Sequence, residues 1–200
     1  DRDRDRDRPA TEQSWSEEWR ELGLGARLPR PGARMTNLLF VQTGFGVDQH
    51  GDREGEGATK AAVRAVRNAI EFNAIPGAIE SVPGGRGEML IRVKLGVPPG
   101  GERGEGSSSE PMSVDLSHVS KVFPYGRLMP IEVVVGGLSF PTGRIVCELG
   151  DKDDLAICVA ASVSIGYDEK KISGNNQENS DNLSCSTGSS HKTYSTKDGY

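Results

Sequence analysis

Residues 38–51 read LLFVQTGFGVDQHG, an apolar run that leads directly into a glycine-rich segment. The four consecutive apolar residues at 38–41 predict a buried strand, and we expect order to begin at about Asn37. A polar stretch follows to about Gly57, and Thr59 then begins a predicted helix with an apolar stripe along one side. Pro76 and Gly77 end that helix. This strand–loop–helix unit is the framework from which the rest of the fold is predicted.

Alternating apolar residues predict three further strands, at 89–97, 131–135 and 155–165. Weaker apolar pairs suggest short strands at 79–82 and 145–147, and a weak helical pattern over 114–122 ends before Pro124. Strands with one apolar face, joined by few helices, predict an α+β fold: two layers, with a mostly antiparallel sheet and helices on one face. The second face of 155–165 carries only small residues, which would let a helix or another subunit approach closely. We expect an oligomer to bury the face of the sheet that the helices leave free.

The composition predicts one modest domain with polar additions. Only 34% of the 200 residues are hydrophobic, while 26 are Gly and 11 are Pro. We therefore expect a disordered extension over 1–35, with one short helix at 14–22, and a disordered tail over 168–200. Between them lies a single α+β domain over 36–167, which contains a mobile loop at 98–110.

Charge and hydropathy exclude several classes of protein. The net charge is −5 with no basic stripe, which argues against nucleic acid as a partner. No run approaches the roughly 20 apolar residues that span a bilayer, so we expect no membrane partner. The three cysteines form no disulfide framework, which favours a soluble intracellular protein of the cytoplasm or the chloroplast. Because the chain begins with Asp, we expect a fragment or a processed form, with any targeting signal lost upstream.

Asp48 and His50 are the strongest candidates for chemistry. Residues two apart in an extended stretch point to the same side, so the two side chains are expected to converge. An Asp oxygen and a His nitrogen suit Zn, Mn or Fe, which makes the pair a candidate metal site. Alternatively, Asp48 orients His50 as a catalytic general acid or base. The competing structural interpretation is an Asp that caps a turn beside a His bonded to the backbone.

A second candidate is a ligand-binding site for an anion. The predicted helix carries Lys60, Arg64 and Arg67 in its first turns, and helix N-termini attract anions. Gly44, Gly46 and Gly51 would allow a ligand to approach the backbone closely. The alternative is a solvated basic helix face.

The motif G-x-G-x-D-x-H-G at Gly44–Gly51 occurs with several separated phrases, VFPYG at 122–126, VVVGG at 133–137 and AASVSIGY at 160–167. Together they resemble a family of uncharacterised proteins of bacteria, cyanobacteria and plants, over about residues 36–167. The resemblance implies a plant or algal member and makes Gly44, Gly46, Asp48, His50 and Gly51 signature residues, although the link over 52–58 is longer than usual. It carries over no activity.

From the residues we predict binding of a small anionic or phosphorylated metabolite at this loop, and whether the protein is an enzyme stays open. The alternative is a non-catalytic homo-oligomeric assembly or regulatory module.

Overall fold

A computed structural model describes residues 25–51, 57–73, 75, 77–100 and 110–170. The helix predicted over 14–22 lies outside these residues. So do most of the loop predicted over 98–110 and the tail from residue 171. In the described part of the chain, no helix is long and apolar enough to cross a membrane.

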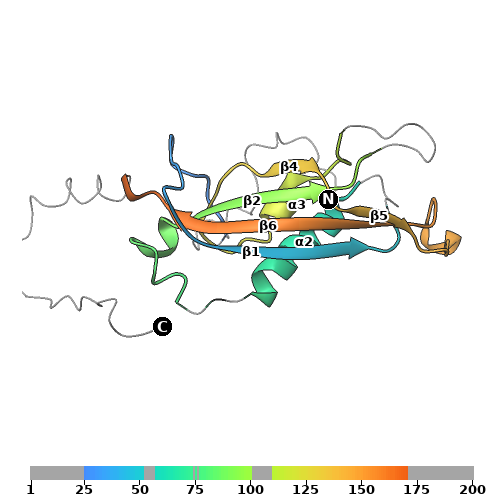
Figure 1. The fold of residues 1–200 in the computed structure, drawn as a ribbon, viewed down its shortest axis with the longest axis horizontal. Coiled ribbons are helices and arrows are strands. Elements are labelled where there is room, and N and C mark those ends of the chain that lie inside the picture. The colour runs from blue at the N-terminus through green and yellow to red at the C-terminus, as the bar shows by residue number, and fades with distance from the viewer. Residues whose placement is uncertain (1–24, 52–56, 74, 76, 101–109, 171–200) are drawn as a thin grey trace, which may run out of the picture.

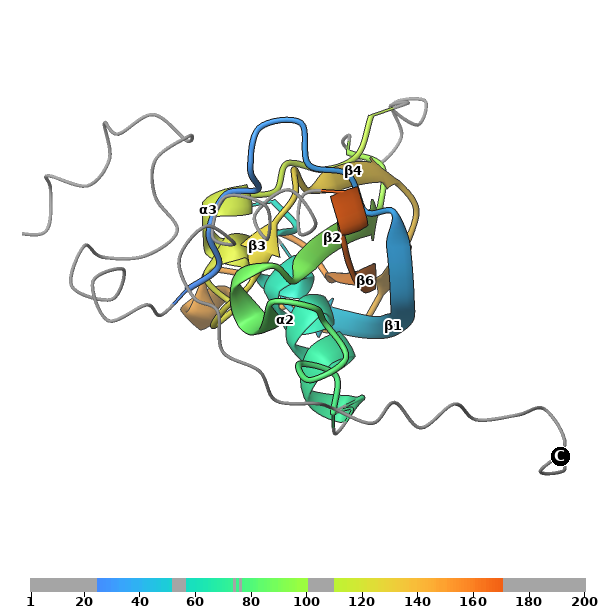
Figure 2. The same ribbon diagram turned by 90° about the vertical axis from the view of Figure 1, so that its left-hand side faces the viewer.

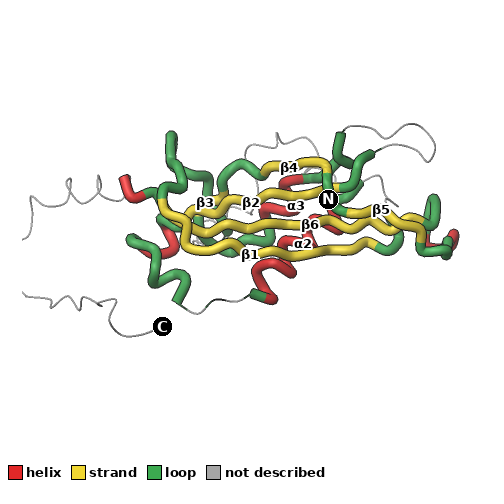
Figure 3. The backbone as a smooth tube through the Cα atoms, in the orientation of Figure 1, coloured by secondary structure: helices red, strands yellow, loops and turns green. Residues whose placement is uncertain are grey.

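The fold is built on one six-stranded sheet with the order β1-β6-β2-β3, in which β4 also pairs with β2 and β5 with β6 (Figures 1 and 3). All pairs with β6 are antiparallel, whereas β3 and β4 run parallel to β2. The strands are β1 Asn37–Asp48, β2 Leu90–Val97, β3 Arg127–Leu128, β4 Glu132–Val135, β5 Leu138–Pro141 and β6 Leu155–Tyr167.

Helices cover one face of this sheet (Figure 2). The helices bounded within the described residues are α2 Thr59–Phe72 and α3 Leu116–Ser120, with the short 3₁₀ turns η1 Gly85–Gly87 and η2 Cys147–Leu149. This arrangement confirms the predicted α+β fold with a mostly antiparallel sheet.

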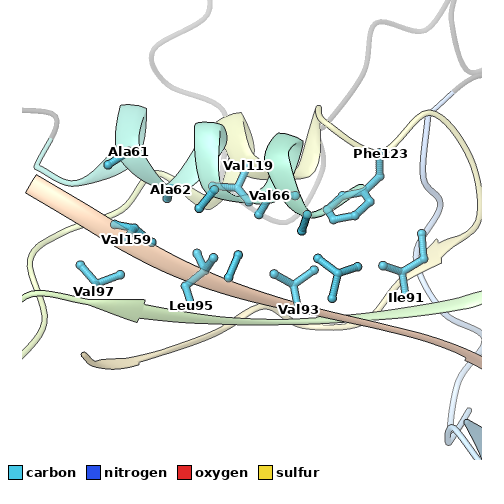
Figure 4. Close-up of a cluster of buried hydrophobic side chains, with 14 of the residues drawn as sticks. Ala61, Ala62, Val66, Ile91, Val93, Leu95, Val97, Val119, Phe123 and Val159 are labelled. Carbon is cyan, nitrogen blue, oxygen red and sulfur yellow. The ribbon is translucent and has the colours of Figure 1, made fainter. Parts of the chain in front are cut away.

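The hydrophobic core lies between α2 and the sheet (Figure 4). In β2 the apolar residues at every second position are buried while Arg92 and Lys94 are exposed, as the alternation predicts. Val119 of α3 and Phe123 after it close one side of the core. The helix contributes mainly small residues, Ala61, Ala62, Ala65, Val66 and Ala69.

Gly44 and Gly46 of β1 allow α2 to lie with its backbone against the strand. A Cβ added at Gly44 would lie 2.4 Å from the Ala65 carbonyl oxygen, and one at Gly46 would lie 2.2 Å from that of Ala61. No real Cβ contact is that short, so any side chain at either position must displace the helix. The glycines of β1 and the alanines of α2 therefore form the two sides of one close contact between strand and helix.

The free edge of β1 is capped by side chains of α2 and of the residue that follows it. Asn73 donates to the Thr43 carbonyl at 3.2 Å, and Asn68 accepts the Phe45 N–H at 3.0 Å. Arg64 donates to the Val47 carbonyl. An uncovered strand edge can pair with another chain. Here one backbone group at each of three alternate positions already has a side-chain partner, which disfavours the outer edge of β1 over this stretch as a pairing surface.

Two of the shorter predicted strands are wrong. Residues 79–82 form turns, and 145–147 lead into η2. Ile145 is 53% exposed, so its apolar side chain does not mark a buried strand. The sequence also misses β3, which has only two residues, and β5, whose four residues are all exposed and end in a proline.

We predict that Gly44→Ala and Gly46→Ala each lower the free energy of unfolding by about 1–3 kcal/mol or more, because the added methyl group overlaps backbone that side-chain rotation cannot move. The matched control is Gly87→Ala, since an added Cβ there meets nothing within 4 Å. Denaturant titration measures all three variants. Equal stability of the Gly44 variant and the control would contradict the close contact.

Asp115 provides a pH-dependent test of how α3 begins. Partial burial raises the pKa of this carboxyl, but hydrogen bonds from Ser117 and His118 more than offset the burial and lower the pKa from 3.8 to about 2. Because the folded-state pKa is depressed, the ionised group stabilises the fold above the unfolded pKa of 3.8, and this contribution is lost as the pH falls towards 2. The stability difference between wild type and Asp115→Asn should therefore shrink across that window, as chemical denaturation at each pH will show. A difference that does not depend on pH would contradict the cap.

Candidate functional site

Asp48 marks the place where β1 ends beside the first two turns of α2. It is the last residue of the strand and is only 6% exposed. Lys60 Nζ lies 3.8 Å from its Oδ2, and Arg64 Nη1 lies 3.6 Å from its Oδ1. These distances are longer than direct hydrogen bonds, so the two cations balance the buried charge without being fully engaged by it.

The extended geometry expected for residues 48–50 is wrong, because the strand stops at Asp48 and Gln49 and His50 form a turn. The contact between the two candidates is from the His50 backbone N–H to Asp48 Oδ1, at 3.5 Å. The His50 ring instead contacts a residue far along the chain. Its Nδ1 lies 3.2 Å from Oδ2 of Asp151.

Asp151 holds the His50 ring in a defined orientation. Its side chain is 1% exposed, and its Oδ2 also accepts the Val146 N–H at 2.8 Å. A carboxylate at Nδ1 favours the tautomer that donates there, which leaves the Nε2 lone pair for another proton. The His50 side chain is 39% exposed, so this ring is accessible to solvent.

Gly51 completes the turn that brings these groups together. It adopts a φ of +61°, and a Cβ there would lie 2.8 Å from the carbonyl oxygen of Leu155, the first residue of β6. Backbone contacts thus account for all three motif glycines, since Gly44 and Gly46 lie against α2. Their predicted contact with a ligand stays a prediction.

Of the three basic residues predicted to bind an anion, the structure brings Lys60 and Arg64 to Asp48. Arg67 lies exposed further along α2. His118 is placed elsewhere, where it pairs with Asp115 at 2.8 Å.

Among the described residues, no three His, Cys, Asp or Glu side chains gather closely enough to hold a metal ion. A metal on Asp48 and His50 therefore stays a prediction, which metal analysis of protein purified without chelators will test.

Asp151 is the site residue that the sequence did not single out. It stands in the run GDKDD at 150–154, and nothing in the pattern separates it from Asp153 or Asp154. Only the fold shows that it is the carboxylate beside His50.

Comparison with known proteins identifies the family. Residues 38–165 match the model of the Lin0512 family of conserved hypothetical proteins. A crystal structure of an FtsZ-like protein of unknown function from Nostoc punctiforme is 35% identical, and the match covers 68% of this chain and 100% of that one with a TM-score of 0.50. A search of curated proteins gave no significant match. The chain belongs to the Lin0512 family, an uncharacterised family of unknown function, and the match spans the strand, turn and helix that form the site.

We predict that Asp151→Ala lowers the free energy of unfolding by about 1–3 kcal/mol, because it leaves the Val146 N–H without its acceptor. Asp151→Asn keeps an acceptor oxygen and should cost less. Glu148→Ala, an exposed change in the same loop, should stay within about 0.5 kcal/mol of wild type. Denaturant titration of the three variants tests this order, and an Asp151→Ala variant as stable as the Glu148 control would contradict it.

Proposed function

We propose that the protein binds a small anionic or phosphorylated metabolite where β1 meets α2, and that His50 exchanges a proton with it. The observation that carries this proposal is the orientation of the partly exposed His50 ring by the buried Asp151, which occupies one ring nitrogen and leaves the other for a ligand. A buried carboxylate at one ring nitrogen suits a general acid or base, because it fixes the ring and stabilises the protonated form.

Lys60 and Arg64 support the anionic character of the ligand. Their side chains are 48% and 52% exposed, and both keep N–H donors that the long contacts to Asp48 do not use. Both belong to the first two turns of α2, where the helix dipole adds partial positive charge. A carboxylate or phosphate group can therefore accept hydrogen bonds here without displacing Asp48.

The described charges support a proton transfer beside an anion site. Lys60 and Arg64 lie beside Asp48, and the buried Asp151 lies beside His50. In the proposed step, Nε2 of His50 takes a proton from the ligand and Asp151 stabilises the imidazolium that forms.

Binding of inorganic phosphate tests the anion site. We expect phosphate to raise the melting temperature of the wild type more than chloride does at equal ionic strength. In the double variant Lys60→Gln/Arg64→Gln, we expect the phosphate affinity to fall by about tenfold or more, which corresponds to about 1.4 kcal/mol. Lys121→Gln, at an exposed residue next to α3, is the charge-matched control for one of the two changes. Equal responses to phosphate and chloride in the wild type would overturn the proposal.

His50→Ala separates a ligand site from a structural turn. If the site binds a ligand through His50, this variant should keep the wild-type fold and oligomeric state and lose part of its stabilisation by phosphate. A variant that changes its oligomeric state while it keeps its phosphate response would instead favour the non-catalytic assembly module.

A further inference from the structure

The face of the sheet opposite the helices carries large apolar side chains that no described element covers. On β1, Phe45 is 65% exposed and Val41 is 50% exposed. On β5, Leu138 is 64% exposed and Phe140 is 41% exposed. Scattered apolar residues are normal on a surface, but these lie on one face of one sheet.

Small residues of β6 lie beside β1 on this face. Phe45 pairs with Ala160, which has Gly96 of β2 on its other side, and both Val47 and Leu138 pair with Cys158. Figures 1 and 3 view this face, with β6 flanked by β1 on one side and by β2 and β5 on the other. The outward face therefore has a low centre along β6 and an apolar rim along β1. On the other side it has an apolar rim along β5 at one end and the charged residues Lys94 and Arg92 of β2 at the other.

We propose that this face packs against the same face of a second copy of the chain. Two sheets pack face to face at about 10 Å when side chains of each fill the hollows of the other. In a dimer with two-fold symmetry, the same surface of each subunit must carry both the protruding side chains and the hollows that receive them. Here the rim of β1 supplies Phe45, and the small residues of β6 supply the space for its counterpart from the partner.

The dimensions of the face suit a dimer. β1 has 12 residues, and at about 3.3 Å per residue it is about 40 Å long. β6 has 13 residues, β2 has 8, and β4 and β5 have four each, with neighbouring strands about 4.8 Å apart. The projected area of the strands is then roughly 650 Å², of the same order as the roughly 800 Å² that each partner buries in a specific interface.

Two further observations favour a second copy packed by its face. The outer edge of β1 is partly capped by Asn68, Asn73 and Arg64, which disfavours continuation of the sheet into a neighbour along this stretch. On the face itself, Lys94 and Glu132 pair with each other at 2.7 Å. Their charges cancel, so this pair adds no net charge to the face, although Arg92 of β2 adds one positive charge on the same side.

Sedimentation equilibrium of the full chain tests the proposal. We expect the wild type to be a dimer in the micromolar range, and Phe45→Asp and Leu138→Asp each to weaken the dimer by about 100-fold or more. The control is Phe72→Asp, which adds the same charge at an 83% exposed residue at the end of α2. It should leave the dimer intact.

Ala160→Leu provides a second test that adds no charge. It fills the low centre of the face, so it should also weaken the dimer while circular dichroism shows an unchanged fold. Three results would overturn the proposal: a wild type that stays monomeric, face variants that dimerise like the wild type, or a dimer that dissociates in Phe72→Asp. Because His50 lies in the turn after β1 rather than on this face, His50→Ala should keep the dimer whether or not it binds phosphate.

Discussion

The contact on which the rest of the structure depends is that between the backbones of β1 and α2. Gly44 and Gly46 remove the side chains that would separate the two elements, and alanines on the helix do the same from the other side. This closeness brings the first turns of the helix to the end of the strand. Lys60 and Arg64 can reach Asp48 only because the helix lies so near the strand. It also lets polar side chains of α2 reach the free edge of β1.

One packing constraint therefore serves three purposes. It buries the apolar stripe of α2, it protects the edge of the sheet, and it places two cations beside a buried carboxylate. Backbone contacts explain the glycines of the motif without a ligand. The packing of β1 against α2 does not, however, require the pairing of His50 with the buried Asp151. For this reason the proposed chemistry rests on the turn after β1, and the proposed dimer rests on the opposite face of the same strand.

Residue patterns predicted the elements that bury a regular stripe. The alternation along β2 and β6 and the apolar face of α2 each mark one side as buried, and that is a property of the sequence alone. The patterns failed where burial does not follow a period. β5 is exposed throughout, and residues 79–82 carry apolar side chains in turns.

In the site, Asp48, Lys60 and Arg64 were expected together because they are close in the chain. Asp151 was not expected beside His50, because about 100 residues separate them and only the pairing of β1 with β6 brings their loops together.

The central claim is that the junction of β1 and α2 is a binding site for an anion. The most direct measurement is a titration of isotope-labelled protein with inorganic phosphate, followed by backbone amide chemical shifts. Our account predicts saturable shifts at Asp48, His50 and Gly51 and in the first two turns of α2, with little change on the outward face of the sheet. Shifts confined to other regions, or no saturable shift at all, would contradict it.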